Sequence, residues 1–309
     1  MDKIKYSIVT PAYNEQESLP LFFTKVIPIM ETLGEPFEII AVNDGSRDGT
    51  ENILAEYAKK DKRIKAVNFS RNFGQQAALL CGLKHSGGQA VICMDADLQD
   101  SPDIIGKLIA KWKAGYDVVH AKRAKRKGES AFKKFTAFCY YRLLRKLSGM
   151  DIPKDTGDFK LYDRKVVDTI ISLSEHNRLL RAQTTWVGFR QTSIEFERPE
   201  RQVGQTKYTL KKMIKLATDG IIPNSSAILG LTAKLGVFLN ISSLICYIVF
   251  IVFACIGKAL PLVAWIFPTA AILTSFILIT NGLTNMYIGS IYEEVKNRPI
   301  YIEKNNYNL

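Results

Sequence analysis

The 309-residue sequence lacks the short motifs that mark the common phosphate-binding and metal-binding proteins. It has three histidines and five cysteines, and no two cysteines have C-x-x-C spacing, which argues against a zinc framework or a disulfide scaffold. The patterns G-x-G-x-x-G and G-x-x-x-x-G-K-[ST] are also absent, so neither a dinucleotide-binding fold nor a P-loop is predicted. A phosphorylated ligand would therefore have to be held by a metal ion and by basic side chains.

Two long stretches near the C-terminus lack charge altogether, residues 235–257 and residues 259–292. At about 1.5 Å per residue, the first spans roughly 34 Å, enough for a hydrocarbon core of about 30 Å. We predict two transmembrane helices in a hairpin over residues 235–290, the second with a useful span of about 262–288. The turn between the two stretches has one lysine, whereas Lys and Arg are far denser in the chain before and after the hairpin. This difference predicts an inner (cytoplasmic) membrane protein with both termini in the cytoplasm. Two buried helices of a soluble protein are the alternative.

Basic residues outnumber acidic ones, and the formal net charge of +12 predicts an anionic partner: nucleic acid, a membrane surface or a phosphorylated substrate. A helix over about 129–147 mixes aromatic and basic side chains and is expected to lie on a lipid bilayer. Amphipathic helices over 209–234 are expected to do the same. Nucleic-acid binding, or a helix packed on the sheet with a solvated face, are the alternatives. Because of the two apolar stretches, we expect a bilayer and no nucleic acid.

The first 125 residues alternate between apolar runs of strand length and helical segments. Strands are expected at residues 6–10, 37–42, 64–69, 90–94 and 117–121, with helices between them. This alternation predicts an α/β fold with a mostly parallel sheet, right-handed crossovers and flanking helices.

Polar residues follow the expected carboxyl ends of these strands, where ligands bind in open α/β sheets. They are Tyr13 and Glu15, Asp44, Arg71, Asp95 and Asp97, and Arg123. Two carboxylates as close as those of Asp95 and Asp97 repel each other unless a cation lies between them, and hard oxygen ligands suit Mg²⁺ or Mn²⁺. An acidic loop that caps the next helix is the alternative.

Three segments resemble the family 2 glycosyltransferases, which have the GT-A (Rossmann-like) fold. They are residues 9–15 (VTPAYNE), 42–46 (VNDGS) and 95–100 (DADLQD). Asn43 is a departure, because the family usually has Asp there.

Later segments resemble the branch of the family that transfers sugars to polyprenyl phosphate, which includes dolichol-phosphate mannose synthase and bacterial undecaprenyl-phosphate glucosyltransferases. They are residues 155–159 (DTGDF), 201–208 (RQVGQTKY) and 294–299 (EVKNRP), the last following the two apolar stretches.

The resemblance implies a membrane-bound, inverting transfer of a hexose from a nucleotide sugar, UDP-glucose, to undecaprenyl phosphate for cell-envelope glycosylation. UDP-N-acetylglucosamine, a modified pentose or GDP-mannose as donor, and a non-catalytic membrane scaffold of a sugar-lipid flippase, are the alternatives. It implies a catalytic domain over 1–208 and a cytoplasmic tail over 291–309. A homo-oligomer is expected, with residues 300–302 adding a strand to a neighbouring copy.

The resemblance also implies roles for individual residues. The metal ligands are Asp95, Asp97 and Gln99, and the catalytic residues are Asp97, Asp158, Arg201 and Lys207. The nucleotide-sugar-binding residues are Pro11, Ala12, Tyr13, Glu15, Asp44, Arg71, Asp95, Ala96, Arg123 and Arg181. Asp158 is either a general base or a residue that aligns the acceptor. For Arg71 and Arg181 a salt bridge is an equal alternative, and the three histidines are given no role.

Overall fold

The structure is a computed structural model that describes residues 4–123, 156–175, 179–196 and 294–309, with scattered positions between 255 and 292. The predicted basic helix over 129–147, the predicted juxtamembrane helices over 209–234 and most of the two apolar stretches lie outside the described residues, as do Arg201 and Lys207. Within the part of the chain that is described, no helix combines the length and the apolar character needed to cross a membrane.

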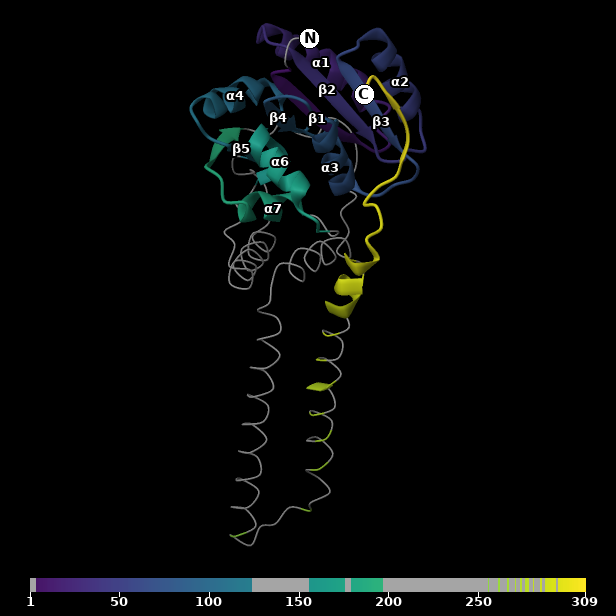
Figure 1. The fold of residues 1–309 in the computed structure, drawn as a ribbon, viewed down its shortest axis with the longest axis vertical. Coiled ribbons are helices and arrows are strands. Elements are labelled where there is room, and N and C mark those ends of the chain that lie inside the picture. Colours follow the sequence, from purple (N-terminus) through teal and green to yellow (C-terminus); the bar gives the residue numbers. More distant parts are fainter. Residues whose placement is uncertain are drawn as a thin grey trace. The chain divides into compact units, whose positions relative to one another are not determined.

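One sheet of eight strands organises the described residues, in the order β7-β5-β6-β4-β1-β2-β3-β8 (Figure 1). The strands are β1 Tyr6–Ala12, β2 Phe37–Asn43, β3 Ile64–Phe69, β4 Ala90–Cys93, β5 Val118–Arg123, β6 Thr156–Asp163, β7 Gln191–Phe196 and β8 Glu303–Tyr307. Strands β1 to β4 pair in parallel, as do β5 and β7, whereas β6 is antiparallel to β4 and β5 and β8 is antiparallel to β3. The predicted mostly parallel sheet is confirmed.

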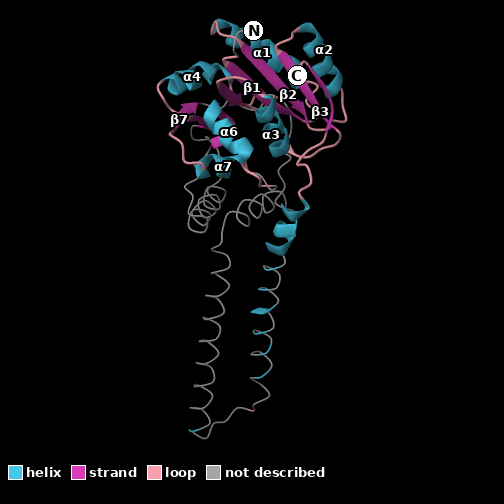
Figure 2. Ribbon diagram, in the orientation of Figure 1, coloured by secondary structure: helices cyan, strands magenta, loops and turns pink. Residues whose placement is uncertain are grey.

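Helices cover both faces of the sheet (Figure 2). One core contains α1 Ser18–Thr32, α2 Thr50–Lys60 and α4 Ile105–Lys113, and the other contains α3 Gln75–His85, α6 Arg164–Ser172 and α7 Leu180–Trp186. Successive side chains of a strand point to opposite faces, so Ile8 belongs to the first core and Val9 to the second. Burial on both faces explains why these strands are continuous apolar runs in the sequence.

The five predicted strands correspond to β1 to β5, but three further strands were not predicted. The most important is β6, which lies between β4 and β5. Its sequence, TGDFKLYD, has the charged residues Asp158 and Lys160 where a central strand usually has apolar ones, so it lacks the apolar run by which the other strands were predicted.

The C-terminal residues Arg298–Leu309 belong to the same compact unit as the sheet, and their strand β8 runs beside β3 (yellow in Figure 1). The sequence predicted that residues 300–302 would add a strand to a neighbouring copy. The strand begins at Glu303 and pairs with β3 of the same chain, and a contact with a neighbouring copy stays a prediction. The side-chain amide of Asn308 donates to the backbone carbonyl of Ile64 at 2.8 Å, and Tyr301 stacks on Phe69 with ring centroids 4.8 Å apart. The tail thus covers an edge strand that would otherwise expose unpaired backbone groups.

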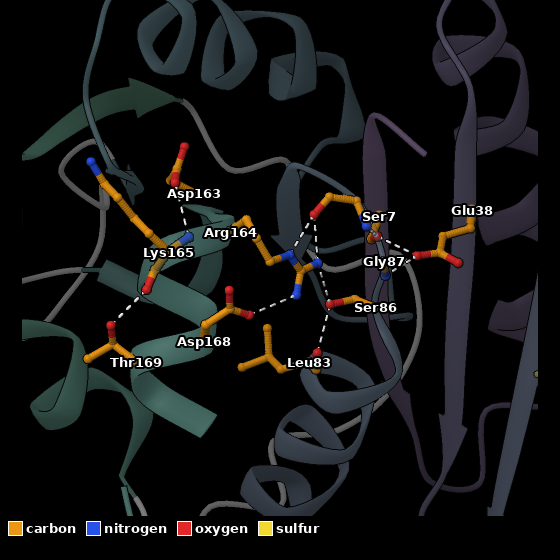
Figure 3. Close-up of polar contacts among 11 residues, drawn as sticks. Ser7, Glu38, Leu83, Ser86, Gly87, Asp163, Arg164, Lys165, Asp168 and Thr169 are labelled. Carbon is orange, nitrogen blue, oxygen red and sulfur yellow. Dashed lines mark hydrogen bonds and ion pairs between the residues drawn. The ribbon is translucent and has the colours of Figure 1, made fainter. Parts of the chain in front are cut away.

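A buried polar network joins the amino ends of the central strands to α6 (Figure 3). Glu38, only 2% exposed, accepts hydrogen bonds from the Ser7 hydroxyl and the Gly87 N–H, both at 2.6 Å. Its second carboxylate oxygen lies 2.7 Å from the Lys65 Nζ atom. The guanidinium of Arg164, the first residue of α6, donates to the backbone of the loop before β4 at 2.8 Å. Glu38 therefore holds β1, β2 and this loop together at the amino ends of the strands. The predicted site lies at the opposite, carboxyl ends of β1 and β2.

Replacing Glu38 with alanine should lower the free energy of unfolding by about 2–5 kcal/mol, because it leaves buried donors without an acceptor and removes the partner of Lys65. Denaturant unfolding of the purified protein measures the change. The exposed Glu56, which pairs with Lys60 on the surface of α2, is the matched control. Glu56→Ala should leave stability unchanged, and an equal loss in both variants would contradict the role assigned to Glu38.

Candidate functional site

The candidate site lies where β4 ends and β6 begins. These strands are antiparallel, and Cys93 of β4 is opposite Lys160 of β6. Asp95 and Asp158 each lie two residues beyond this pair, toward the same edge of the sheet. Two carboxylates that are far apart in the sequence are therefore neighbours, because a strand that runs against β4 starts where β4 ends.

The turn after β4 presents three oxygen-bearing side chains, Asp95, Asp97 and Gln99, all half-buried. The Asp97 carboxylate accepts a hydrogen bond from the Gln99 N–H at 3.1 Å. Between them, Leu98 has a φ of 52°, which is unusual for a bulky residue, and its side chain packs against the core. Strained backbone of this kind persists where packing holds it and occurs often at functional sites. Two carboxylates and an amide oxygen fit a hard dication such as Mg²⁺ or Mn²⁺.

Two glutamines at the start of α3 hold the two carboxylates, and neither was predicted. The side-chain amide of Gln75 donates to Asp95 at 2.9 Å, and that of Gln76 donates to Asp158 at 3.2 Å. The Gln76 carbonyl oxygen accepts from the backbone N–H of Leu180, the first residue of α7, at 3.0 Å. Helix α3 therefore links the turn after β4 to the start of β6 and to α7. No sequence motif marks these glutamines.

A buried ion pair fixes Asp158, which is 9% exposed. The Nε atom of Arg181 donates to its carboxylate at 2.9 Å, so the salt bridge considered for Arg181 is present. Burial alone would raise the pKa of Asp158, but the nearby Arg181 and Lys160 and the hydrogen bonds hold this pKa below its usual range. Lys160, also not predicted, is 1% exposed, and burial lowers its pKa to about 8. Near neutrality the three residues together carry a net positive charge.

The other titratable groups beside Lys160 are uncharged. His120 is opposite Lys160 on β5, and burial lowers its pKa to about 4, so the ring is neutral. Its Nε2 atom lies 2.8 Å from the side-chain oxygen of Gln191. Burial raises the pKa of the Cys93 thiol, so no thiolate forms there. Neither side chain offers a charge at neutral pH.

The turns after β1 and β2 are tied to each other. The Asn14 N–H donates to the Ser46 hydroxyl at 2.9 Å, and the Glu15 N–H donates to the Thr50 hydroxyl at 3.0 Å. Tyr13 is 44% exposed, so its ring is free to stack on a planar ligand. The predicted residues Pro11, Ala12 and Ala96 have small or partly buried side chains that shape this edge and offer no hydrogen-bonding group.

Asp44 is 3% exposed and anchors the loop after β3. Its carboxylate accepts from the backbone N–H of Phe73 at 2.6 Å and of Gly74 at 2.9 Å, and burial raises its pKa. Gly45, with a φ of 64°, lies so close to this loop that a Cβ atom would be 2.3 Å from the backbone carbon of Arg71. Asp44 therefore has a structural role, and its predicted nucleotide contact stays a prediction.

Of the predicted basic residues other than Arg181, the structure describes Arg71 in full and Arg123 in its backbone. Arg71 is exposed, and its guanidinium lies over the Phe73 ring, 4.1 Å from the centroid. Arg123 is the last residue of β5, on the same edge as the other site residues. Its side chain lies outside the described residues, as do Arg201 and Lys207, so their roles stay predictions.

Solved structures with this fold include glucosyl-3-phosphoglycerate synthase from Mycobacterium tuberculosis in complex with Mn²⁺, UDP and phosphoglyceric acid. It is 16% identical, has a TM-score of 0.50, and the match covers 71% of this chain and 76% of that one. At this identity the match supports the fold alone.

Sequence relatives cover nearly the whole chain. An uncharacterized glycosyltransferase of Bacillus subtilis, YkcC, is 42% identical over 99% of this chain and 95% of its own length. The SfII prophage-derived bactoprenol glucosyl transferase of Shigella flexneri is 38% identical over 98% of this chain and 99% of its own. The sequence profile of glycosyl transferase family 2 matches residues 7–171, which contain the turns after β1, β2 and β4 and the start of β6. The chain is therefore a glycosyltransferase and belongs to glycosyl transferase family 2.

Proposed function

We propose that the protein transfers glucose from UDP-glucose to undecaprenyl phosphate, with inversion at the anomeric carbon. The sequence relative named bactoprenol glucosyl transferase, which matches end to end, supports both the sugar and the lipid acceptor. The observation that carries the proposal is that Asp158, with its net positive surroundings, lies beside the Asp95–Gln99 turn at one edge of the sheet. The groups that would bind the donor diphosphate therefore lie next to those that would bind the anionic acceptor.

On the donor side, Asp95, Asp97 and Gln99 would hold a divalent cation. Mg²⁺ or Mn²⁺, when bound there, supplies positive charge to the diphosphate leaving group. The exposed ring of Tyr13 stacks on the base, and Glu15, whose backbone is fixed by Thr50, lies near the ribose. The predicted phosphate contacts of Arg123, Arg201 and Lys207 complete this side, because guanidinium and ammonium groups bind phosphate oxygens well.

On the acceptor side, a phosphate oxygen of the lipid attacks the anomeric carbon, a new carbon–oxygen bond forms, and the bond to the diphosphate breaks to release UDP. A phosphate monoester loses its second proton at a pKa of about 6, so near neutrality the attacking oxygen carries no proton that must be removed. Asp158 has a pKa below its usual range and is a poor base. We therefore assign it acceptor alignment, with Arg181 and Lys160 offsetting its negative charge.

The acceptor is a membrane lipid, which agrees with the predicted bilayer partner. The proposal places the two predicted transmembrane helices, residues 235–290, in the cytoplasmic membrane, with the catalytic domain and both termini in the cytoplasm. The predicted homo-oligomer is part of the same proposal. Strand β8 is paired with β3 of its own chain on one side and is the last strand of the described sheet, so a neighbouring copy could pair only with its outer edge.

Purified full-length protein should move radiolabelled glucose from UDP-glucose into organic-extractable lipid when undecaprenyl phosphate and Mg²⁺ or Mn²⁺ are present, and a chelator should abolish transfer. Asp97→Asn should lower turnover by about 10²-fold or more, because it removes a charged ligand of the cation. Asp103→Asn, at an exposed carboxylate just outside the turn, is the control and should retain activity.

The same assay separates the alternatives. Transfer only from UDP-N-acetylglucosamine, a modified pentose donor or GDP-mannose would replace glucose in the proposal. No transfer from any donor would contradict undecaprenyl phosphate as the acceptor, because the non-catalytic scaffold is already excluded by the family assignment. An active Asp97→Asn variant would contradict the assigned cation site.

The pH dependence of kcat tests the role of Asp158. The rate should rise with pH through about 6, or slightly below, as the acceptor becomes a dianion. Asp158 is already ionised in this range because its pKa is lowered, so it should contribute no inflection. Asp158→Asn should therefore reduce kcat, by about 10²-fold, and leave the inflection in place. The exposed Asp168→Asn on α6 is the control. Loss of the inflection in Asp158→Asn would identify Asp158 as the base.

A further inference from the structure

Three metal-ligating side chains meet at the far end of α3, away from the candidate active site. Cys81 and His85 are four residues apart on the helix, so they share one face. Glu303, the first residue of β8, lies against this face, with its carboxylate oxygen 2.9 Å from His85 Nε2 and 3.9 Å from Cys81 Sγ. All three ligand atoms lie within 4.8 Å of one another.

These separations are close to those of a four-coordinate metal site. Bonds of about 2.3 Å to sulfur and about 2.0–2.2 Å to nitrogen and oxygen place tetrahedral ligands roughly 3.3–3.6 Å apart. Shifts of about 1 Å in Cys81, His85 and Glu303 would reach this geometry. His85 and Glu303 are part-exposed, which leaves room for water as a fourth ligand.

The surroundings of the three ligands support such a site. The second carboxylate oxygen of Glu303 accepts a hydrogen bond from the Asn306 side chain at 3.5 Å, and the Tyr301 hydroxyl is close enough to Cys81 to hydrogen-bond its sulfur. Partners of this kind orient metal ligands in known sites. The cytoplasm, where the sequence predicts both termini, keeps thiols reduced, which favours metal binding over a disulfide.

We propose that Cys81, His85 and Glu303 bind one Zn²⁺-class divalent cation, which fastens the C-terminal strand β8 to helix α3. Sulfur, nitrogen and oxygen ligands in a four-coordinate set suit Zn²⁺, and not the Mg²⁺ or Mn²⁺ expected at Asp95 and Asp97. Without metal, burial keeps the Cys81 thiol protonated, since it raises its pKa to about 12. The cation displaces this proton and binds the thiolate. This proposal does not rest on the proposed glycosyl transfer.

The site would connect the tail to the active site through a single rigid element. Helix α3 begins with Gln75 and Gln76, which contact Asp95 and Asp158, and it ends with His85. Between them, Gly82 lies directly on β1, where a Cβ atom would be 2.2 Å from a methyl carbon of Val9. A metal at one end of α3 therefore restrains the helix whose other end positions the catalytic carboxylates.

Cobalt substitution tests the site without any activity assay. Purified full-length protein, stripped with a chelator and titrated with Co²⁺, should show a thiolate-to-cobalt charge-transfer band in the near ultraviolet at one equivalent, and Zn²⁺ should abolish it. Cobalt at Asp95 and Asp97 gives no such band, because these ligands lack sulfur. Cys81→Ser should lose the band, and Glu303→Gln should weaken cobalt binding by about tenfold or more. Cys255→Ser, at an exposed thiol elsewhere, is the matched control and should keep it.

Thermal unfolding provides a second measurement. Zn²⁺ should raise the Tm of the stripped wild type by several degrees and raise that of His85→Gln and Glu303→Gln clearly less. Both side chains are part-exposed, so these variants keep the test valid if Cys81→Ser does not fold. A wild type without the band, or an equal band in Cys81→Ser, would overturn the proposal and leave the three residues as a hydrogen-bonded contact.

Discussion

The antiparallel pairing of β6 with β4 is the constraint on which the candidate active site depends. If β6 ran parallel to β4, Asp158 would lie near the amino end of β4, and Asp95 would lie beyond its carboxyl end. The pairing also buries Asp158 and Lys160 in the middle of the sheet, where an unpaired charge would be costly. Arg181 from α7 and Gln76 from α3 make this burial tolerable, and in doing so they fix the direction in which the carboxylate points.

Part of this arrangement follows from local sequence. The apolar runs of β1 to β5 and the polar residues after them were sufficient to predict the α/β fold and the edge that holds Tyr13, Asp44 and Asp95. Strand β6 was missed because Asp158 and Lys160 are buried charged residues that interrupt the apolar run expected of a central strand. Gln75, Gln76 and Lys160 were missed because their roles come from packing between segments that are far apart in the chain.

Packing between distant segments also explains why the cluster of Cys81, His85 and Glu303 was not predicted. Cys81 and His85 have helical spacing, but two ligands on one helix are common and carry little information. The third ligand, Glu303, comes from beyond two long apolar stretches, and only the pairing of β8 with β3 brings it to α3. Long-range contacts of this kind have no local pattern, whereas strand and turn signals do.

The position of β8 also has a consequence for synthesis. Translation completes β3 at Phe69 but reaches β8 only at Glu303, an interval on the order of 10–50 s at ordinary elongation rates. During that interval β3 is an edge strand of the nascent domain, with unpaired backbone N–H and C=O groups. Other emerging chains and chaperones can bind to these groups. A polypeptide terminated early keeps this edge for its lifetime, which gives cellular quality control a physical basis for distinguishing truncated from finished molecules.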